Sequence, residues 1–139
     1  MSTINTNPTG GGMIETSITE ALSRFLDVDV ARYKLITTNL ANIDTPGYRT
    51  RDLDFQAELR RAAAEAAGAE ESGLTPASFS PVSRTVPGLV ERPDGNNVSL
   101  ERESLLLAET QMKFNLGVQL LKDQFHTISL AINSGGSSS

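Results

Sequence analysis

The chain has 139 residues, of which 38% are hydrophobic and only 5% aromatic, so it can form one small domain with a modest core. Its formal net charge of −5 argues against a nucleic-acid-binding protein, because such proteins need clustered Lys and Arg to neutralise phosphates. The absence of cysteine excludes disulfides, thiolate nucleophiles and Cys-based zinc sites.

The sequence predicts neither a membrane span nor a cleaved signal peptide. Its apolar runs are far shorter than the roughly 20 residues that cross a bilayer. The first residues, MSTINTNPTGGGM, carry no positive charge and no apolar stretch. We therefore expect no direct insertion into a membrane.

Residues 1–13 are mainly Thr, Asn, Pro and Gly, which favours a flexible tail, and a helical pattern then covers residues 14–44. Apolar residues recur there at alternating spacings of four and three, which is typical of a coiled-coil seam. This N-terminal seam consists of Ile18, Leu22, Leu26, Val30, Tyr33, Ile36, Leu40 and Ile43. Further apolar residues beside it make the apolar face too wide for one partner helix to cover.

The helix is predicted to end near Asp44, because Thr45 precedes a proline and is driven out of the helical region. A type II turn should follow, with Pro46 at its second position and Gly47 supplying a positive φ at its third. We expect the Thr45 hydroxyl to bond the Gly47 amide, since Pro46 has no N–H. An Asp at the negative end of a helix dipole is unfavourable, which points to a specific contact of Asp44.

Residues 45–98 are predicted to hold this turn, a short helix and a Pro- and Gly-rich irregular segment. The helix should cover residues 52–71, with either Asp52 or Asp54 as its N-cap. Beyond it the composition leaves room only for a short strand around residues 84–91.

A second long helix is predicted over residues 99–133, with Ser99 as its N-cap, followed by a flexible tail at 134–139. Its apolar residues form a C-terminal seam with the same alternating spacing. This seam consists of Leu100, Leu107, Phe114, Val118, Leu121, Phe125, Ile128 and Ile132. A second stripe on the roughly opposite side contains Leu105, Met112, Leu116 and Leu130.

The predicted fold is therefore mainly α, with two long amphipathic terminal helices that pair as an antiparallel coiled coil. Each helix would still expose apolar side chains, at about 1.5–3 kcal/mol apiece if they are later buried. This pattern is typical of a subunit whose core is completed by its neighbours.

The residues predict no enzyme, no metal site and no cofactor. His126 is the only histidine and has no Cys or second His with which to share a metal. The acidic pairs, Asp27 with Asp29 and Glu101 with Glu103, are spaced by two, which splays them around a helix, so structural or solvating roles are expected.

Three stretches carry a family resemblance: LITTNLANIDTPGY at residues 35–48, RDLDF at 51–55 and DGNNVSLE at 94–101. The first resembles the N-terminal signature of bacterial flagellar rod and hook axial proteins. The other two, with the lack of a large central β domain, resemble the small members of the proximal rod. The resemblance implies terminal helices that assemble as a coiled coil into a tubular structure beside the inner-membrane ring. It implies copies of the same chain, other rod proteins, ring and ring–rod junction proteins and the type III export apparatus as partners.

We interpret the first signature as a rigid corner that stops the wall-forming helix and directs the middle segment toward a neighbour. The corner consists of Asn39, Asn42, Asp44, Thr45, Pro46, Gly47 and Tyr48. The turn chemistry alone also fits an ordinary loop between helices. Two other functions stay open: another small rod protein, or a helical secretion chaperone or adaptor, which would also expose apolar stripes.

Overall fold

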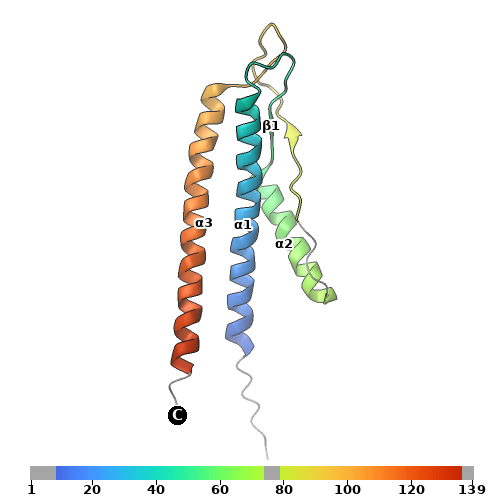
Figure 1. Ribbon diagram of the computed structural model, residues 1–139. Helices are drawn as coiled ribbons and strands as arrows, with labels where there is room; N and C mark the ends of the chain where they lie inside the picture. Colours follow the sequence, from blue (N-terminus) through green and yellow to red (C-terminus); the bar gives the residue numbers. More distant parts are fainter. Residues whose placement is uncertain (1–8, 74–78, 136–139) are drawn as a thin grey trace, which may run out of the picture.

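A computed structural model describes residues 9–73 and 79–135, which form three helices and one two-stranded sheet. The helices are α1 (Thr9–Ala41), α2 (Phe55–Ser72) and α3 (Leu100–Gly135). Helices α1 and α3 lie side by side and run antiparallel, and α2 packs against α1 (Figure 1). The chain is mainly helical, as predicted. Within the described ranges, no helix has the length and apolar character that crossing a membrane requires.

The long helices extend beyond the limits predicted for them at the ends of the chain. Helix α1 begins at Thr9 rather than at Ile14, so it includes three glycines, each of which disfavours a helix by about 1 kcal/mol relative to Ala. The predicted start of this helix at residue 14 reflects that unfavourable free energy. Helix α3 ends at Gly135, inside the predicted tail. The rest of the two predicted tails, residues 1–8 and 136–139, lies outside the described residues.

At the other end, α1 stops at Ala41, earlier than the predicted Asp44. The next residues form tighter turns, in which the amide of Ile43 donates to the Leu40 carbonyl at 3.3 Å. Such bonds between residues three apart are common where a helix terminates.

The middle segment contains α2 and the short antiparallel strands β1 (Arg51–Asp52) and β2 (Arg84–Thr85). Asp54 is the N-cap of α2, since its carboxylate accepts the amide hydrogen bond of Ala57 at 3.1 Å. The strand predicted around residues 84–91 is cut short because a turn follows, where Gly88 has a φ of 76°. Ser99 is the N-cap of α3, as predicted.

Few apolar side chains are fully buried, and polar ones outnumber them. The buried hydrophobic residues are Val28, Ile36, Leu53, Ala62 and Val98. The buried polar residues are Asp29, Asn39, Thr50, Glu58, Asn96, Asn97, Glu103 and Thr110. Hydrogen bonds rather than apolar contacts therefore fix much of the interior.

Helix α3 faces α1 with polar or small residues, because its buried positions are Glu103, Thr110 and Gly117. At Gly117 the helices approach so closely that an added Cβ would lie 2.8 Å from Leu26 Cδ2 and 3.1 Å from the Phe25 ring. The three positions are spaced by seven residues, which suits a continuous seam between two helices. Coiled-coil geometry itself stays a prediction.

The apolar residues of the two predicted seams lie partly within the chain, where Leu26 contacts the Gly117 position, and partly at the surface. Of the N-terminal seam, Ile36 is buried within the chain, whereas Ile18, Val30 and Tyr33 are exposed and Leu22, Leu26, Leu40 and Ile43 are half-buried. Of the C-terminal seam, Leu107, Val118, Leu121 and Ile128 are half-buried, and Leu100, Phe114, Phe125 and Ile132 are exposed.

Candidate functional site

The candidate site is the corner that joins α1 to the middle segment, at the end of the helix pair opposite the first turn of α1 and the last turn of α3 (Figure 1). The predicted type II turn is present: the Tyr48 amide donates to the Thr45 carbonyl at 3.2 Å, and Gly47 has a φ of 73°. The predicted bond from the Thr45 hydroxyl to the Gly47 amide is wrong. That hydroxyl donates to the Asn42 side chain at 3.1 Å instead.

A second loop, which leads into α3, packs against this turn. The Gly47 amide donates to the Asp94 carbonyl at 2.9 Å, and a Cβ added to Gly95 would lie 3.3 Å from the Gly47 Cα. Arg92 donates to the carbonyl of Ile43, which places a positive charge at the negative end of α1. The two loops thus form one unit, and the close approach depends on having glycine at position 95.

Asn96 joins the second loop to the end of α1. Its side-chain amide donates to the carbonyls of Asn42 at 2.9 Å and Thr45 at 2.8 Å, while its oxygen accepts the Val98 amide at 2.8 Å. The residue is completely buried. Each of these two carbonyls also accepts a backbone amide, from Thr45 and Tyr48 respectively, so Asn96 adds a second donor to each and fixes the turn against the second loop.

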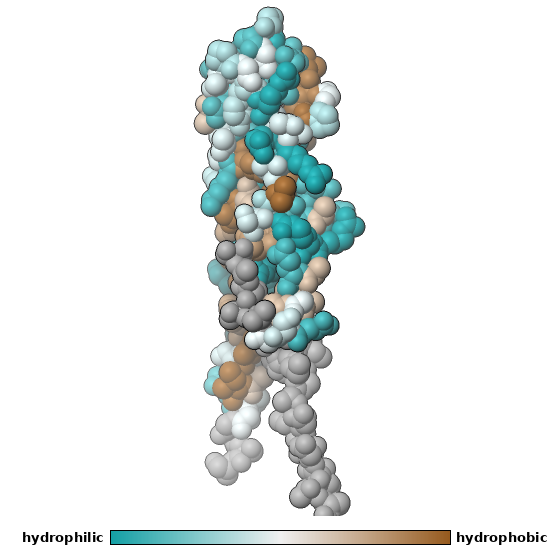
Figure 2. Space-filling model, turned by 90° about the vertical axis from the view of Figure 1, so that its right-hand side faces the viewer, coloured by the Kyte–Doolittle hydropathy of each residue, from teal (hydrophilic) through white to brown (hydrophobic). Residues whose placement is uncertain are grey.

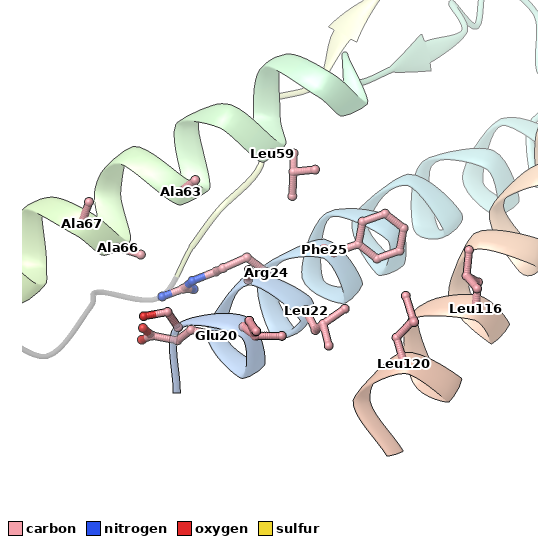
Figure 3. Close-up of a pocket in the computed structure, with 13 residues that line it drawn as sticks. Glu20, Leu22, Arg24, Phe25, Leu59, Ala63, Ala66, Ala67, Leu116 and Leu120 are labelled. Carbon is pink, nitrogen blue, oxygen red and sulfur yellow. The ribbon is translucent and has the colours of Figure 1, made fainter. Parts of the chain in front are cut away.

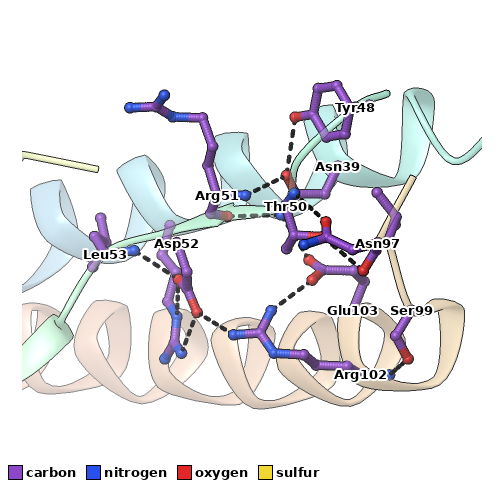
Figure 4. A network of polar contacts seen from close by, with 12 residues as sticks. Asn39, Tyr48, Thr50, Arg51, Asp52, Leu53, Asn97, Ser99, Arg102 and Glu103 are labelled. Atoms are coloured by element: carbon purple, nitrogen blue, oxygen red, sulfur yellow. Dashed lines mark hydrogen bonds and ion pairs between the residues drawn. The ribbon is translucent and has the colours of Figure 1, made fainter. Parts of the chain in front are cut away.

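Asn39 occupies the centre of the network in Figure 4. Its oxygen accepts from the Tyr48 hydroxyl at 3.0 Å and the Arg51 amide at 3.1 Å. Its amide nitrogen donates to the Arg51 carbonyl at 2.8 Å and to Glu103 Oε2 at 3.1 Å. One buried side chain therefore uses all four of its hydrogen-bonding positions to connect α1, β1 and α3.

Asn97 holds the strand side of the corner in a similar way. Its side-chain oxygen accepts the Thr50 amide at 2.7 Å, and its carbonyl accepts the Thr50 hydroxyl at 3.2 Å. Its own amide donates to the Tyr48 carbonyl at 3.3 Å. Burial raises the pKa of the Tyr48 hydroxyl above its usual 10.0.

An ion-pair chain extends the network along the helices. Asp52 accepts from Arg32 Nε at 3.1 Å and from Arg102 Nη2 at 2.8 Å, and Arg102 Nη1 also donates to the buried Glu103 at 2.7 Å (Figure 4). Burial acts to raise the pKa of Asp52, but the hydrogen bonds and charge of Arg32, the Leu53 amide and Arg102 outweigh it, so the pKa lies below its usual 3.8.

The structure brings most of the predicted corner residues together, although their exposure differs. Asn39 is buried and Asn42 and Tyr48 are half-buried, whereas Asp44, Thr45, Pro46 and Gly47 are exposed. Asp44 makes no hydrogen bond or ion pair within residues 9–73 and 79–135, so the contact expected for it is not found there.

Sequence reasoning did not assign the partners that complete the corner: Arg32, Thr50, Asp52, Asn96, Asn97, Arg102 and Glu103. Within the stretch DGNNVSLE, Asn96 and Asn97 were singled out through the family resemblance and not as partners of the corner. Adjacent Asn96 and Asn97 directly after Gly95 were the available signal, since Asn side chains satisfy turn backbones.

An apolar groove lies between the three helices, away from the corner. Leu22 and Phe25 of α1, Leu59 of α2, and Leu116 and Leu120 of α3 point into a common space of about 550 Å³, which alanines of α2 also line (Figure 3). On the face that carries α2, hydrophobic side chains reach the surface among hydrophilic ones (Figure 2). The molecule therefore leaves apolar surface uncovered along its helices.

No family model matches the chain. It is 32% identical over 124 residues to the flagellar basal body rod protein FlgB of Salmonella typhimurium, an alignment that covers 79% of this chain and 88% of that protein. The FlgB protein of Borrelia hermsii is 30% identical over 122 residues (78% and 90%), and that of Escherichia coli is 27% identical over 122 residues (79% and 88%). With this identity over most of both chains, and with the motifs at the corner, the chain belongs to the family of flagellar basal body rod proteins FlgB.

Proposed function

We propose that this protein is a structural subunit of the proximal flagellar rod, which polymerises through its terminal helices into the tube between the inner-membrane ring and the distal rod. The observation that carries the proposal is the apolar surface along α1 and α3. Phe125 is 55% exposed, Ile132 69%, Leu105 69% and Met112 73%. A monomeric protein rarely exposes such stripes unless they bind a partner.

The assembly interface would use the half-buried and exposed seam residues. On α1 these are Leu22, Leu26, Val30, Tyr33, Leu40 and Ile43; on α3 they are Leu107, Phe114, Val118, Leu121, Phe125, Ile128 and Ile132. An exposed side chain of this set contributes about 1.5–3 kcal/mol if a neighbour buries it completely, and a half-buried one contributes less. Ile36 belongs to the same predicted seam but would act from inside the chain, as part of its core.

The partners proposed on the basis of family membership are copies of this chain, other rod proteins, the inner-membrane ring and the ring–rod junction proteins. The subunit would reach the periplasmic rod through the flagellar type III export apparatus without a cleaved signal. No catalytic role, cofactor or nucleic-acid partner is part of the proposal.

The corner would set the angle at which the middle segment leaves the wall-forming helix. Gly47→Val tests this role, because a β-branched residue strongly disfavours the φ of 73°. Gly47→Asn is the matched control, because Asn tolerates this conformation and a Cβ added here meets no atom within 4 Å. In cells that lack the wild-type chain, we expect the Val variant to abolish motility and the Asn variant to keep it. Normal swimming with Gly47→Val would contradict the role of the corner.

The location is tested by mass spectrometry of purified, detergent-extracted basal bodies. Recovery of the chain in particles that keep the inner-membrane ring and rod supports the proposed function. Recovery only from the cytosol would instead favour a secretion chaperone or adaptor, whose exposed stripes would hold partner helices.

A further inference from the structure

A carboxylate without a partner lies buried between the two long helices. Asp29 of α1 is 1% exposed, and neither of its side-chain oxygens has a hydrogen-bond partner among the described residues. Thr110, on the facing side of α3, is 2% exposed, and its hydroxyl also lacks a partner in this part of the chain. Buried polar atoms are nearly always paired in folded proteins, because leaving them unpaired is costly. Two such groups together indicate that a partner is missing.

Both residues line a groove of about 440 Å³ between α1 and α3. Val30, Tyr33 and Phe114 also line it and are 37%, 44% and 40% exposed. The remaining lining residues, Gln111 and Asn115, are exposed and polar. The groove thus combines apolar walls with an acidic group and a hydroxyl that have no partner.

The cations and anions closest to Asp29 are already engaged with one another. Arg32 pairs with Asp52, with 3.1 Å between Nε and Oδ1, and Lys113 pairs with Glu109 at 2.7 Å. The chain itself therefore supplies no donor to the Asp29 carboxylate within the described residues.

We propose that this groove receives the Lys122 side chain of a second copy of the chain. The four-carbon stem of a lysine packs against apolar walls, and its ammonium group donates up to three hydrogen bonds, enough for both Asp29 and Thr110. This inference rests on the proposed function, because it assigns one contact of the assembled rod.

Few basic side chains are free for such a contact. Only four Lys and Arg residues have no acceptor in the described part of the chain, and all four are exposed: Lys34, Arg60, Arg84 and Lys122. Arg60 and Arg84 belong to the middle segment rather than to the terminal helices that carry the exposed stripes.

The position of Lys122 distinguishes it from Lys34. Lys34 follows Tyr33, which lines the groove, so a reciprocal contact through it would be two-fold and would close a dimer. Lys122 follows Asn115 of the groove by seven residues, so it lies on the same side of α3 but about two turns farther along, beside the exposed Phe125. A contact between groups at different levels along parallel copies repeats head to tail and extends an assembly.

The test uses Lys122→Glu in the full-length chain, with Lys34→Glu as the matched control, in cells that lack the wild-type protein. Both lysines are exposed and have no acceptor among the described residues, so neither change should unfold the monomer. We expect at least a tenfold loss of Lys122→Glu from purified basal bodies and wild-type amounts of Lys34→Glu. The double variant Asp29→Asn with Lys122→Glu should recover part of the loss, because it removes the repulsion between two carboxylates.

A second readout separates this contact from a structural role of Asp29. Asp29→Asn should raise the melting temperature of the isolated chain by several degrees while it lowers incorporation into basal bodies several-fold. Wild-type incorporation of Lys122→Glu, or a lowered melting temperature of Asp29→Asn, would overturn the inference. Absence of the wild-type chain itself from basal bodies would instead overturn the proposed function.

Discussion

Replacement of Asn39 by Ala tests whether the corner is held by its buried hydrogen bonds. The change removes four hydrogen bonds: those with the Tyr48 hydroxyl, with the amide and carbonyl of Arg51, and with the Glu103 carboxylate. A neutral hydrogen bond contributes about 0.5–1.5 kcal/mol net, and one to a charged group about 1.5–3 kcal/mol. The half-buried Tyr48 hydroxyl can recover a bond to water, so we expect a loss of about 3–5 kcal/mol in the free energy of unfolding.

Asn42→Ala is the matched control, because Asn42 lies at the same end of α1 but bonds locally. Its side chain donates to the Thr38 carbonyl at 2.8 Å and accepts from the Thr45 hydroxyl at 3.1 Å, and both bonds are exposed. We expect this variant to lose less than about 1 kcal/mol.

The assay is urea unfolding of the isolated chain, followed by far-ultraviolet circular dichroism. A lower midpoint with an unchanged slope reports a loss of stability without a change in the surface exposed on unfolding. Equal losses for the Asn39 and Asn42 variants would refute the argument, because the buried network would then contribute no more than an exposed turn.

Three further predictions follow from the charges and packing of the helices. Asp52→Asn should destabilise the chain by about 2–3 kcal/mol near neutral pH. Because the pKa of Asp52 is lowered in the folded chain, the ionised carboxylate stabilises the fold at pH values above 3.8. The urea midpoints of wild type and variant should therefore converge as the pH falls below 3.8. Burial raises the pKa of Asp29 from its usual 3.8 to about 6. The folded chain therefore loses stability as pH rises from 3.8 through about 6, because the buried carboxyl ionises. Thermal melts should show Asp29→Asn about 1–3 kcal/mol more stable than wild type at neutral pH, and no more stable in acid. Gly117→Leu should cost about 1–3 kcal/mol by overpacking against α1, whereas Gly68→Leu, with no atom within 4 Å of its added Cβ, should be neutral or stabilising in urea unfolding.

The sequence predicted the features that depend on neighbouring residues. Helical periodicity located both terminal helices, and turn chemistry located Pro46, Gly47 and the cap at Ser99, and narrowed the cap of the short helix to Asp52 or Asp54, of which Asp54 is the cap. These signals are local because a turn or a cap is completed within four or five residues. The same reasoning placed the start of the first helix at residue 14, whereas it begins at Thr9, because a glycine run opposes the helix that forms.

The sequence did not predict which polar residues are buried. Glu101 and Glu103 lie in the same first turn of α3, yet Glu101 is exposed and Glu103 is completely buried. Both fit the helix dipole equally well, so local chemistry does not separate them. The difference arises from Asn39, which lies far away in the sequence and donates to Glu103 across the helix pair.

The fully buried residues of α3 differ from those of its apolar seam for a related reason. An apolar period predicts the face that a helix buries, and the strongest apolar period of α3 runs through Leu107, Phe114 and Leu121. Within one chain, however, α3 buries Glu103, Thr110 and Gly117 against α1. Apolar periodicity detects the faces that become buried in any context, and it does not distinguish a contact within the chain from a contact between chains.

The two kinds of contact suit two steps of building a rod. Hydrogen bonds such as those of Asn39 and Asn96 depend on alignment, so they fix one geometry for the corner before any neighbour is present. Apolar contacts are non-directional and scale with the area removed from water. We propose that the small apolar core leaves much of that stabilisation for the assembled rod, where burial of the exposed stripes would add to each subunit's stability by mass action. In this proposal the corner forms before assembly, and the long helices would gain most of their stability from neighbouring subunits.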